Sequence, residues 1–308
     1  MKYRLHLSYL LIAIFCLLLW GCSGSSSASR KEHSGPPRDS TPKVLIPSAD
    51  GVTVYQNDLA SIDASNTSQG YVMVKYNGTN EKVKLQITCP DQSCYTYLIS
   101  DRGAYDTFPL TAGNGSYALQ VLENVAGDTY TVSLAQSINV SIEDEFLPFL
   151  YPNQYVNFHT DSKAVSKGSD LAKDTYSDLD VVQNIYNYVI KNISYDTEKA
   201  QNVSYGYVPD IDDTLSSKKG ICFDYAALMT SMLRSQNIPT KLEVGYSGDA
   251  YHAWISTYID DKGWVDDIIQ FNGNTWQIMD PTLAATNDSA AVKKYVGDGS
   301  HYVVKYTY

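Results

Sequence analysis

Residues 220–240 read GICFDYAALMTSMLRSQNIPT, and this stretch decides the fold of the second half of the chain. Apolar residues recur at helical spacing after Cys222, and Pro239 breaks the pattern, so the sequence predicts a helix that opens at the cysteine. Unpaired N–H groups at a helix N-terminus favour a thiolate and a developing oxyanion. Cys222 is therefore a candidate nucleophile, and the ordinary alternative is a buried core cysteine.

His252 and Asp280, which follow Cys222 in the sequence, are candidates for the base and the carboxylate that a thiol nucleophile needs. His252 begins the alternating run HAWISTYID, which predicts a strand, and Asp280 ends a second short predicted strand, WQIMD. Each residue alone has an ordinary structural explanation, a core histidine in one case and a turn cap in the other. Together with Cys222 they form the minimum set for covalent acyl transfer: a nucleophile, a base and an orienting carboxylate.

The blocks GICFDYAALMTSMLRSQNIPT, YHAWISTYI and WQIMDPT resemble, in this order, the transglutaminase-like cysteine enzymes, which share a papain-like core. The resemblance covers about residues 175–285. It implies that Cys222 accepts the acyl group, that His252 is the general base and that Asp280 orients the imidazole. The second oxyanion donor is not evident; Tyr195 is the candidate side chain, with plain core packing as its alternative.

The resemblance implies an enzyme that transfers acyl groups from protein or peptide amides through a thioester on Cys222. Water completes hydrolysis and a primary amine completes crosslinking; we favour hydrolysis because excluding water needs a specialised site. Two alternatives stay open: a catalytically idle surface binding or scaffolding protein of this fold, and a cell-wall peptidase of another papain-like lineage. The expected partner is a protein or peptide substrate, including cell-wall peptide.

No metal or other cofactor is expected. The sequence has no acidic loop of EF-hand spacing, so it implies no calcium requirement. The pair Cys89 and Cys94 lacks the second Cys or His pair that a zinc site needs. In an oxidising compartment these two residues are candidates for a disulfide, with two unpaired loop thiols as the alternative. Cys222 is then the free thiol.

The N-terminus predicts export. A short basic start precedes an apolar core over residues 10–20, which is too short to span a membrane comfortably. The run LWGC, which ends at Cys22, resembles a lipoprotein signal; an ordinary secretory signal and an uncleaved anchor are the alternatives. We expect residues 1–21 to be the signal peptide and residues 22–43, rich in Ser and Pro, to be a tether from lipidated Cys22. The protein would then be anchored to the outer face of a bacterial membrane.

The charge of the chain limits its partners. The formal net charge is -11, and the sequence shows no basic stripe. This argues against nucleic acid as a partner and against general adhesion to anionic lipid. Contact with the membrane is therefore expected to depend on the lipid anchor.

Residues 44–145 predict an all-β, sandwich-like domain because apolar residues alternate in short runs that turn residues separate. Nothing in this segment resembles a catalytic site, so its expected role is that of a spacer or a ligand-binding module. The runs of alternating residues are Val83, Leu85 and Ile87; Tyr117, Leu119 and Val121; and Tyr130, Val132 and Leu134.

Residues 146–308 predict helices followed by a run of strands, which is typical of the α+β class. Ser177 is the expected N-cap of a helix whose apolar residues recur every three or four positions, and a polar loop is expected from Tyr195 to Asp213. The predicted fold is thus α+β, a papain-like transglutaminase-type core preceded by an all-β sandwich-like domain. Strands are expected at 242–246, 252–259, 264–269, 276–279 and 302–308.

Overall fold

The computed structural model describes residues 35–99, 102–260, 262–265, 269–271, 276–278 and 302–308. The chain divides into two units, Met1–Pro36 and Pro37–Tyr308, and the described helices and strands belong to the second. The domain boundary expected near residue 145 lies inside that unit and stays a prediction. Within these described ranges, no helix has both the length and the apolar composition needed to cross a membrane. Cys22 and Asp280 lie outside the described residues.

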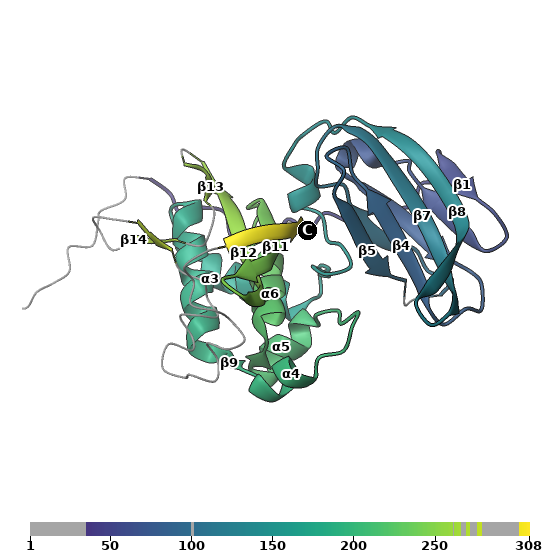
Figure 1. The fold of residues 1–308 in the computed structure, drawn as a ribbon. Coiled ribbons are helices and arrows are strands. Elements are labelled where there is room, and N and C mark those ends of the chain that lie inside the picture. The colour runs from purple at the N-terminus through teal and green to yellow at the C-terminus, as the bar shows by residue number, and fades with distance from the viewer. Residues whose placement is uncertain (1–34, 100–101, 261, 266–268, 272–275, 279–301) are drawn as a thin grey trace, which may run out of the picture. The chain divides into compact units, whose positions relative to one another are not determined.

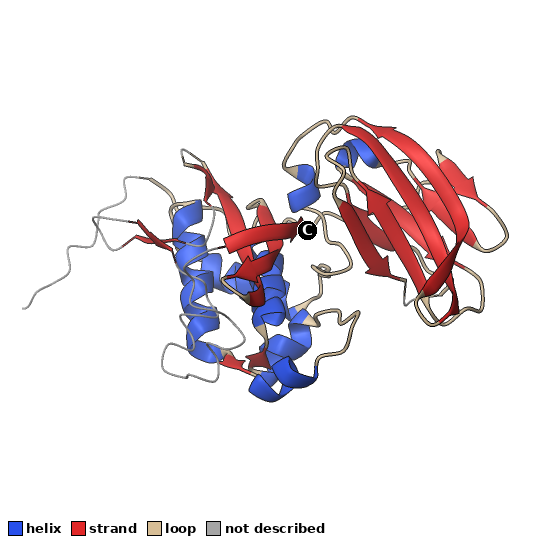
Figure 2. Ribbon diagram, viewed as in Figure 1, coloured by secondary structure: helices blue, strands red, loops and turns tan. Residues whose placement is uncertain are grey.

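Residues 54–140, here called the β region, form two antiparallel sheets of four strands (Figure 2). The sheets pack against each other: the ring of Tyr97 in the second lies 4.9 Å from that of Phe108 in the first. In sheet order, the first consists of β1 (Val54–Gln56), β2 (Ala60–Asp63), β3 (Tyr71–Tyr76) and β6 (Asp106–Pro109). The second consists of β5 (Cys94–Leu98), β4 (Val83–Thr88), β7 (Gly115–Ala126) and β8 (Thr129–Val140).

The alternating pattern predicted two of the three buried faces correctly. Val83, Leu85 and Ile87 are buried, and so are the alternating residues of β7. The prediction for β8 is wrong, because Val132 is 51% exposed. This strand lies at the edge of its sheet, and its pairing with β7 shifts register after Val121, so that Val132 faces Leu122. Such a bulge moves the following side chains to the opposite face of the sheet.

Residues 163–308, here called the α+β region, contain helices beside an antiparallel sheet, which confirms the α+β class. Figure 1 shows α3 and α6 next to the sheet strands β11 and β12. The helices are α2 (Lys163–Ala172), α3 (Asp178–Asn192), α4 (Thr197–Asn202), α5 (Ile211–Ser217) and α6 (Cys222–Arg234). The sheet order is β13 (Gly263–Val265), β12 (Ala250–Ile259), β11 (Thr240–Ser247) and β16 (Tyr302–Thr307). The remaining strands form two pairs: β9 (Ser194–Tyr195) with β10 (Lys219–Gly220), and β14 (Ile269–Phe271) with β15 (Trp276–Ile278).

Helix capping explains which helices the sequence predicted. The Ser177 side chain accepts the N–H of Asp180, and the Asp180 carboxylate accepts the N–H of Ser177, so α3 begins with the expected N-cap in a complete capping box. The predicted polar loop is wrong in part, because it contains α4 and the start of α5. These helices are short, and each is started by an aspartate: Asp196 accepts the N–H of Lys199, and Asp210 accepts the N–H groups of the first turn of α5.

Helix α6 is the centre of the α+β region. From Asp224 to Arg234 every side chain is buried, including the polar ones. At its C-terminal end the Arg234 guanidinium donates to three backbone carbonyls, those of Thr240 at 2.9 Å, Tyr151 at 2.6 Å and Tyr308 at 2.8 Å. One buried cation therefore links the helix to β11 and to two segments distant in sequence. This arrangement fixes the helix whose first residue is Cys222.

Candidate active site

Cys222 is the first residue of α6, as the sequence predicted. The preceding Gly220 must be a glycine because a Cβ atom there would lie 2.7 Å from the Cβ of Asp224. Gly220 also pairs with Tyr195 in the short parallel ladder between β10 and β9. Among the described residues nothing accepts a hydrogen bond from the N–H of Cys222. The chain thus delivers a half-buried thiol beside an available backbone donor at the start of a helix.

A buried carboxylate two residues after the cysteine holds this turn in place. Asp224 is fully buried; its Oδ2 accepts the Ile221 N–H at 2.8 Å and the Lys199 ammonium at 2.7 Å. Its other oxygen accepts the Tyr207 hydroxyl, and the Lys199 ammonium lies 4.5 Å from the centre of the Tyr207 ring. Burial first and the Asp224 carboxylate next raise the pKa of the Tyr207 hydroxyl, so it stays a donor. The network connects the start of α6 to the segment that leads from α4 to α5.

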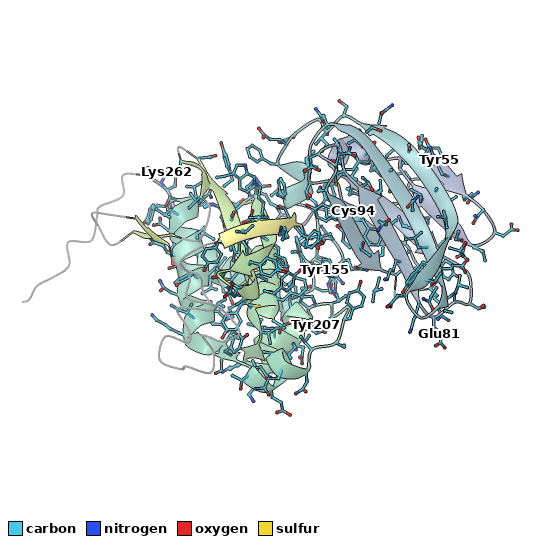
Figure 3. All side chains as sticks on the ribbon, viewed as in Figure 1. Tyr55, Glu81, Cys94, Tyr155, Tyr207 and Lys262 are labelled. Atoms are coloured by element: carbon cyan, nitrogen blue, oxygen red, sulfur yellow. The ribbon has the colours of Figure 1, made fainter. Side chains whose placement is uncertain are left out.

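Sequence reasoning did not identify this network. Asp224 stands at the third position of a helix, where a carboxylate commonly accepts the N–H of the N-cap residue, and that signal was present in the sequence. Its partners Lys199 and Tyr207 lie on a segment that was expected to be a loop, so no spacing rule connects them to it. Figure 3 shows the side chains of Tyr207 and Tyr155 close to α6. Both rings contact Phe223, at centroid distances of 6.5 and 5.3 Å.

His252 lies within β12 and is 1% exposed. The strand begins two residues earlier than the sequence predicted, at Ala250, and His252 faces Gly245 of β11. Gly245 is required because a Cβ atom there would lie 2.0 Å from the carbonyl oxygen of Val303 in β16. The imidazole ring is 6.0 Å from the ring of Trp254, centroid to centroid. A packed, buried strand therefore fixes the histidine.

Cys222 and His252 line the same cavity, which has a volume of about 780 Å³. Tyr195, the candidate oxyanion donor, lines it as well, and that role stays a prediction. Tyr251 also lines the cavity; burial, followed by the charges of Tyr306, Tyr246 and Cys222, raises the pKa of Tyr251 to about 12. The hydroxyl of Tyr251 is therefore neutral near pH 7. The orienting role of Asp280 concerns a residue outside the described part of the chain.

The other two cysteines among the described residues lie in the β region. Cys89, Cys94 and Cys222 are free thiols in this structure, so the Cys89–Cys94 disulfide is not formed here and stays a prediction for an oxidising compartment. Cys89 is buried, and burial raises the pKa of its thiol to about 11. Cys94 is exposed, and its Sγ accepts a long hydrogen bond from Thr88. Cys94 is thus a natural control for the reactivity of Cys222.

Comparisons with known proteins find a family match within the second half of the chain. Residues 166–266 match the model of the transglutaminase-like superfamily. The chain is 30% identical over 118 residues to a UPF0252 protein of Methanocaldococcus jannaschii, a match covering 33% of this chain and 34% of that protein. It is also 30% identical over 107 residues to the kyphoscoliosis peptidase of Mus musculus, covering 30% of this chain and 16% of that protein. A solved candidate cysteine protease from Cytophaga hutchinsonii is 16% identical, with a TM-score of 0.34 over 75% of this chain and 69% of that one.

The matched span contains both Cys222 and His252 and ends before Asp280. The two curated relatives are matched over 34% and 16% of their own lengths, so the likeness concerns one domain. Residues 166–266 therefore form a transglutaminase-like domain. Members of the superfamily are usually cysteine enzymes.

Proposed function

We propose that this protein is a cysteine-nucleophile acyltransferase of the transglutaminase-like type that acts on protein or peptide amides. The observation that carries the proposal is the shared cavity: a thiol at the start of a buried helix and a buried imidazole line the same space. Covalent acyl transfer requires such a pairing of nucleophile and base. The buried Asp224 network supports it, because it fixes the turn on which the thiol stands.

In the proposed reaction, His252 takes the thiol proton and the Cys222 sulfur attacks the carbonyl carbon of a carboxamide. The oxyanion is held by the N–H of Cys222 and, as a second donor, by the hydroxyl of Tyr195. His252 then gives its proton to the departing amine, the C–N bond breaks and a thioester remains. Asp280 is assigned the role of orienting the imidazole.

The thioester is proposed to react mainly with water, which gives a carboxylic acid and restores the thiol. A primary amine would instead form a new amide and so crosslink two chains. Hydrolysis is favoured because the cavity, with a volume of about 780 Å³, is large enough to hold water beside a bound substrate. The partner is a protein or peptide, including cell-wall peptide.

The test uses the full chain, a glutamine-containing peptide and a fluorescent primary amine, with both products followed by mass spectrometry. Cleavage or deamidation that disappears in Cys222→Ala and persists in Cys94→Ala is expected. Incorporation of the amine instead would make crosslinking the main reaction. Full turnover by Cys222→Ala would contradict the proposal, since that variant lacks the nucleophile.

We also propose that Cys22 carries a lipid that anchors the protein to the outer face of a bacterial membrane. Mass spectrometry of the N-terminal peptide from membranes is expected to find a lipid-modified Cys22. Cys22→Ala is expected to prevent the modification. An unmodified Cys22 in the membrane fraction would refute the anchor.

A further inference from the structure

The cavity lined by Cys222 and His252 contains a positively charged side chain, although the chain as a whole is acidic. The protein is acidic, with a formal net charge of -11, but no aspartate or glutamate is among the described residues that line the cavity. Lys84 is the lysine in that lining, and the lining otherwise consists of aromatic, apolar and small polar residues. The cavity therefore offers a bound molecule a positive charge and no carboxylate to repel an anion.

Lys84 lies in β4, where its strand partners are Leu98 in β5 and Leu122 in β7. Both leucines also line the cavity, so the residues on either side of Lys84 in the sheet are apolar. Its ammonium lies 4.1 Å from the ring centre of Tyr130 and 5.6 Å from that of Tyr205. These rings hold the charge by cation–π attraction and keep part of its surface away from water.

The ammonium of Lys84 has no carboxylate within ion-pair distance among the described residues. Lys199, the cation of the Asp224 network, is already paired with that buried carboxylate. A partly desolvated ammonium gains more from a carboxylate than one in water does, because the local dielectric constant is lower. The charge on Lys84 is therefore available to a ligand.

Aromatic side chains line the cavity together with Lys84 and Cys222. Tyr205 is 76% exposed and Tyr251 is 56% exposed, although both line the cavity. Exposed aromatic rings at the wall of a cavity suit the flat, partly polar surface of a peptide chain. The wall that Lys84 and Cys222 share is therefore suited to contact with a polypeptide.

We propose that Lys84 is a carboxylate-binding subsite, so that the preferred substrates are peptides with an acidic group near the reactive carboxamide. The group is either an Asp or Glu side chain or a free C-terminal carboxylate, since both present the same chemistry. The substrate class rests on the proposed function, whereas the binding of an acidic peptide does not. The β region then has a role in substrate choice.

The test compares peptides that differ only in charge. One glutamine peptide carries a nearby Glu, a second has Gln at that position, and each is made with a free and an amidated C-terminus. Binding to the full-length Cys222→Ala protein is measured by titration calorimetry, and KM and kcat are measured with the unaltered chain. Lys84→Gln and Lys84→Arg are the variants, and Lys82→Gln, an exposed lysine just before β4, is the control.

An acidic peptide is expected to bind about tenfold more tightly than its neutral counterpart, and Lys84→Gln is expected to remove that difference. Lys84→Arg should retain the difference, and Lys82→Gln should not change it. Loss of preference upon amidation, rather than upon exchange of Glu, would identify the C-terminal carboxylate as the bound group. Equal binding of all peptides, weakening of every peptide alike by Lys84→Gln, or no binding at all would overturn the inference.

The failures of the two proposals are distinguishable. Turnover that depends on Cys222 but ignores peptide charge would refute the Lys84 subsite and leave the enzyme intact. Preferential binding of acidic peptides that depends on Lys84, without any turnover, would refute the reaction and support the subsite.

Discussion

The β region and the α+β region bury different kinds of residue. In the β region the described core is apolar and aromatic, and its buried carboxylate is Asp63, which accepts N–H groups from neighbouring turns. Among its described residues the α+β region buries two carboxylates, an arginine and a histidine: Asp224, Glu243, Arg234 and His252. Burying such groups costs free energy unless each has a partner.

The free-energy cost of burying charged and polar groups therefore falls mainly on the α+β region. These buried groups belong to α6, the helix that begins with Cys222, and to the paired strands β11 and β12, the second of which carries His252. The β region has no comparable set among its described residues. Buried polar groups that lie next to a cavity are typical of functional sites. Two of these groups, Asp224 and His252, belong to the proposed site and its supporting network. Each prediction below tests a different buried polar group.

The largest effect is expected for His252→Gln. Loss of the general base should reduce kcat/KM for the peptide substrate by about 10²–10⁴-fold. The measurement is steady-state turnover, with thermal unfolding as a check on the fold. His159→Gln is the control, because that side chain is exposed and pairs with Asp161 on the surface. Equal losses in both variants would show that His252 has no special role.

The next effect is on stability. Arg234→Met removes the buried cation that donates to the carbonyls of Thr240, Tyr151 and Tyr308. The Tyr308 carbonyl keeps the N–H of Leu242 as a donor, but each of the three carbonyls loses a charged one. The free energy of unfolding should fall by about 3–5 kcal/mol. Urea denaturation measures the change. A loss below about 1 kcal/mol would mean that a buried arginine here stabilises no more than a surface residue.

The Asp224 network should show coupling between its members. Asp224→Asn leaves the Lys199 ammonium without its carboxylate, and the free energy of unfolding should fall by about 2 kcal/mol. Lys199→Met alone should also destabilise the protein, because it leaves a buried carboxylate unpaired. The double variant should lose less than the sum of the two single losses, by about 1 kcal/mol or more. Strict additivity would refute the ion pair seen at 2.7 Å.

Elements that depend on interactions between residues close in sequence could be predicted, and those that depend on contacts between distant residues could not. Helix α3 and the buried alternation of β4 and β7 were predicted correctly because capping and alternation are local signals. Helix α2 was missed, because its N-terminal N–H groups are accepted by Asp212, a residue far along the chain. The exposure of Val132 depends on a register shift against β7, and the Asp224 network depends on pairing across loops. None of these contacts has a fixed spacing in sequence.

The candidate site shows the same difference between local and long-range contacts. The positions of Cys222 at a helix start and of His252 in a strand could be predicted from adjacent residues. The lining of their common cavity could not, because it includes Lys84 and Tyr130 of the β region. Side chains that meet only after folding leave no periodic pattern in the sequence.

The smallest effect concerns a buried hydroxyl in the same helix as Cys222. Thr230 is fully buried, and within the described part of the chain its Oγ1 has no hydrogen-bond partner. Thr230→Val keeps the shape and removes the unsatisfied group, so it should stabilise the protein by about 1 kcal/mol. Thr214→Val is the matched control: its buried hydroxyl donates to the Asp210 carbonyl at 2.7 Å, and its loss should destabilise by about 1 kcal/mol. If both variants lose stability equally, the hydroxyl of Thr230 has a partner, and the cost assigned to polar burial in α6 is smaller than the comparison of the two regions implies.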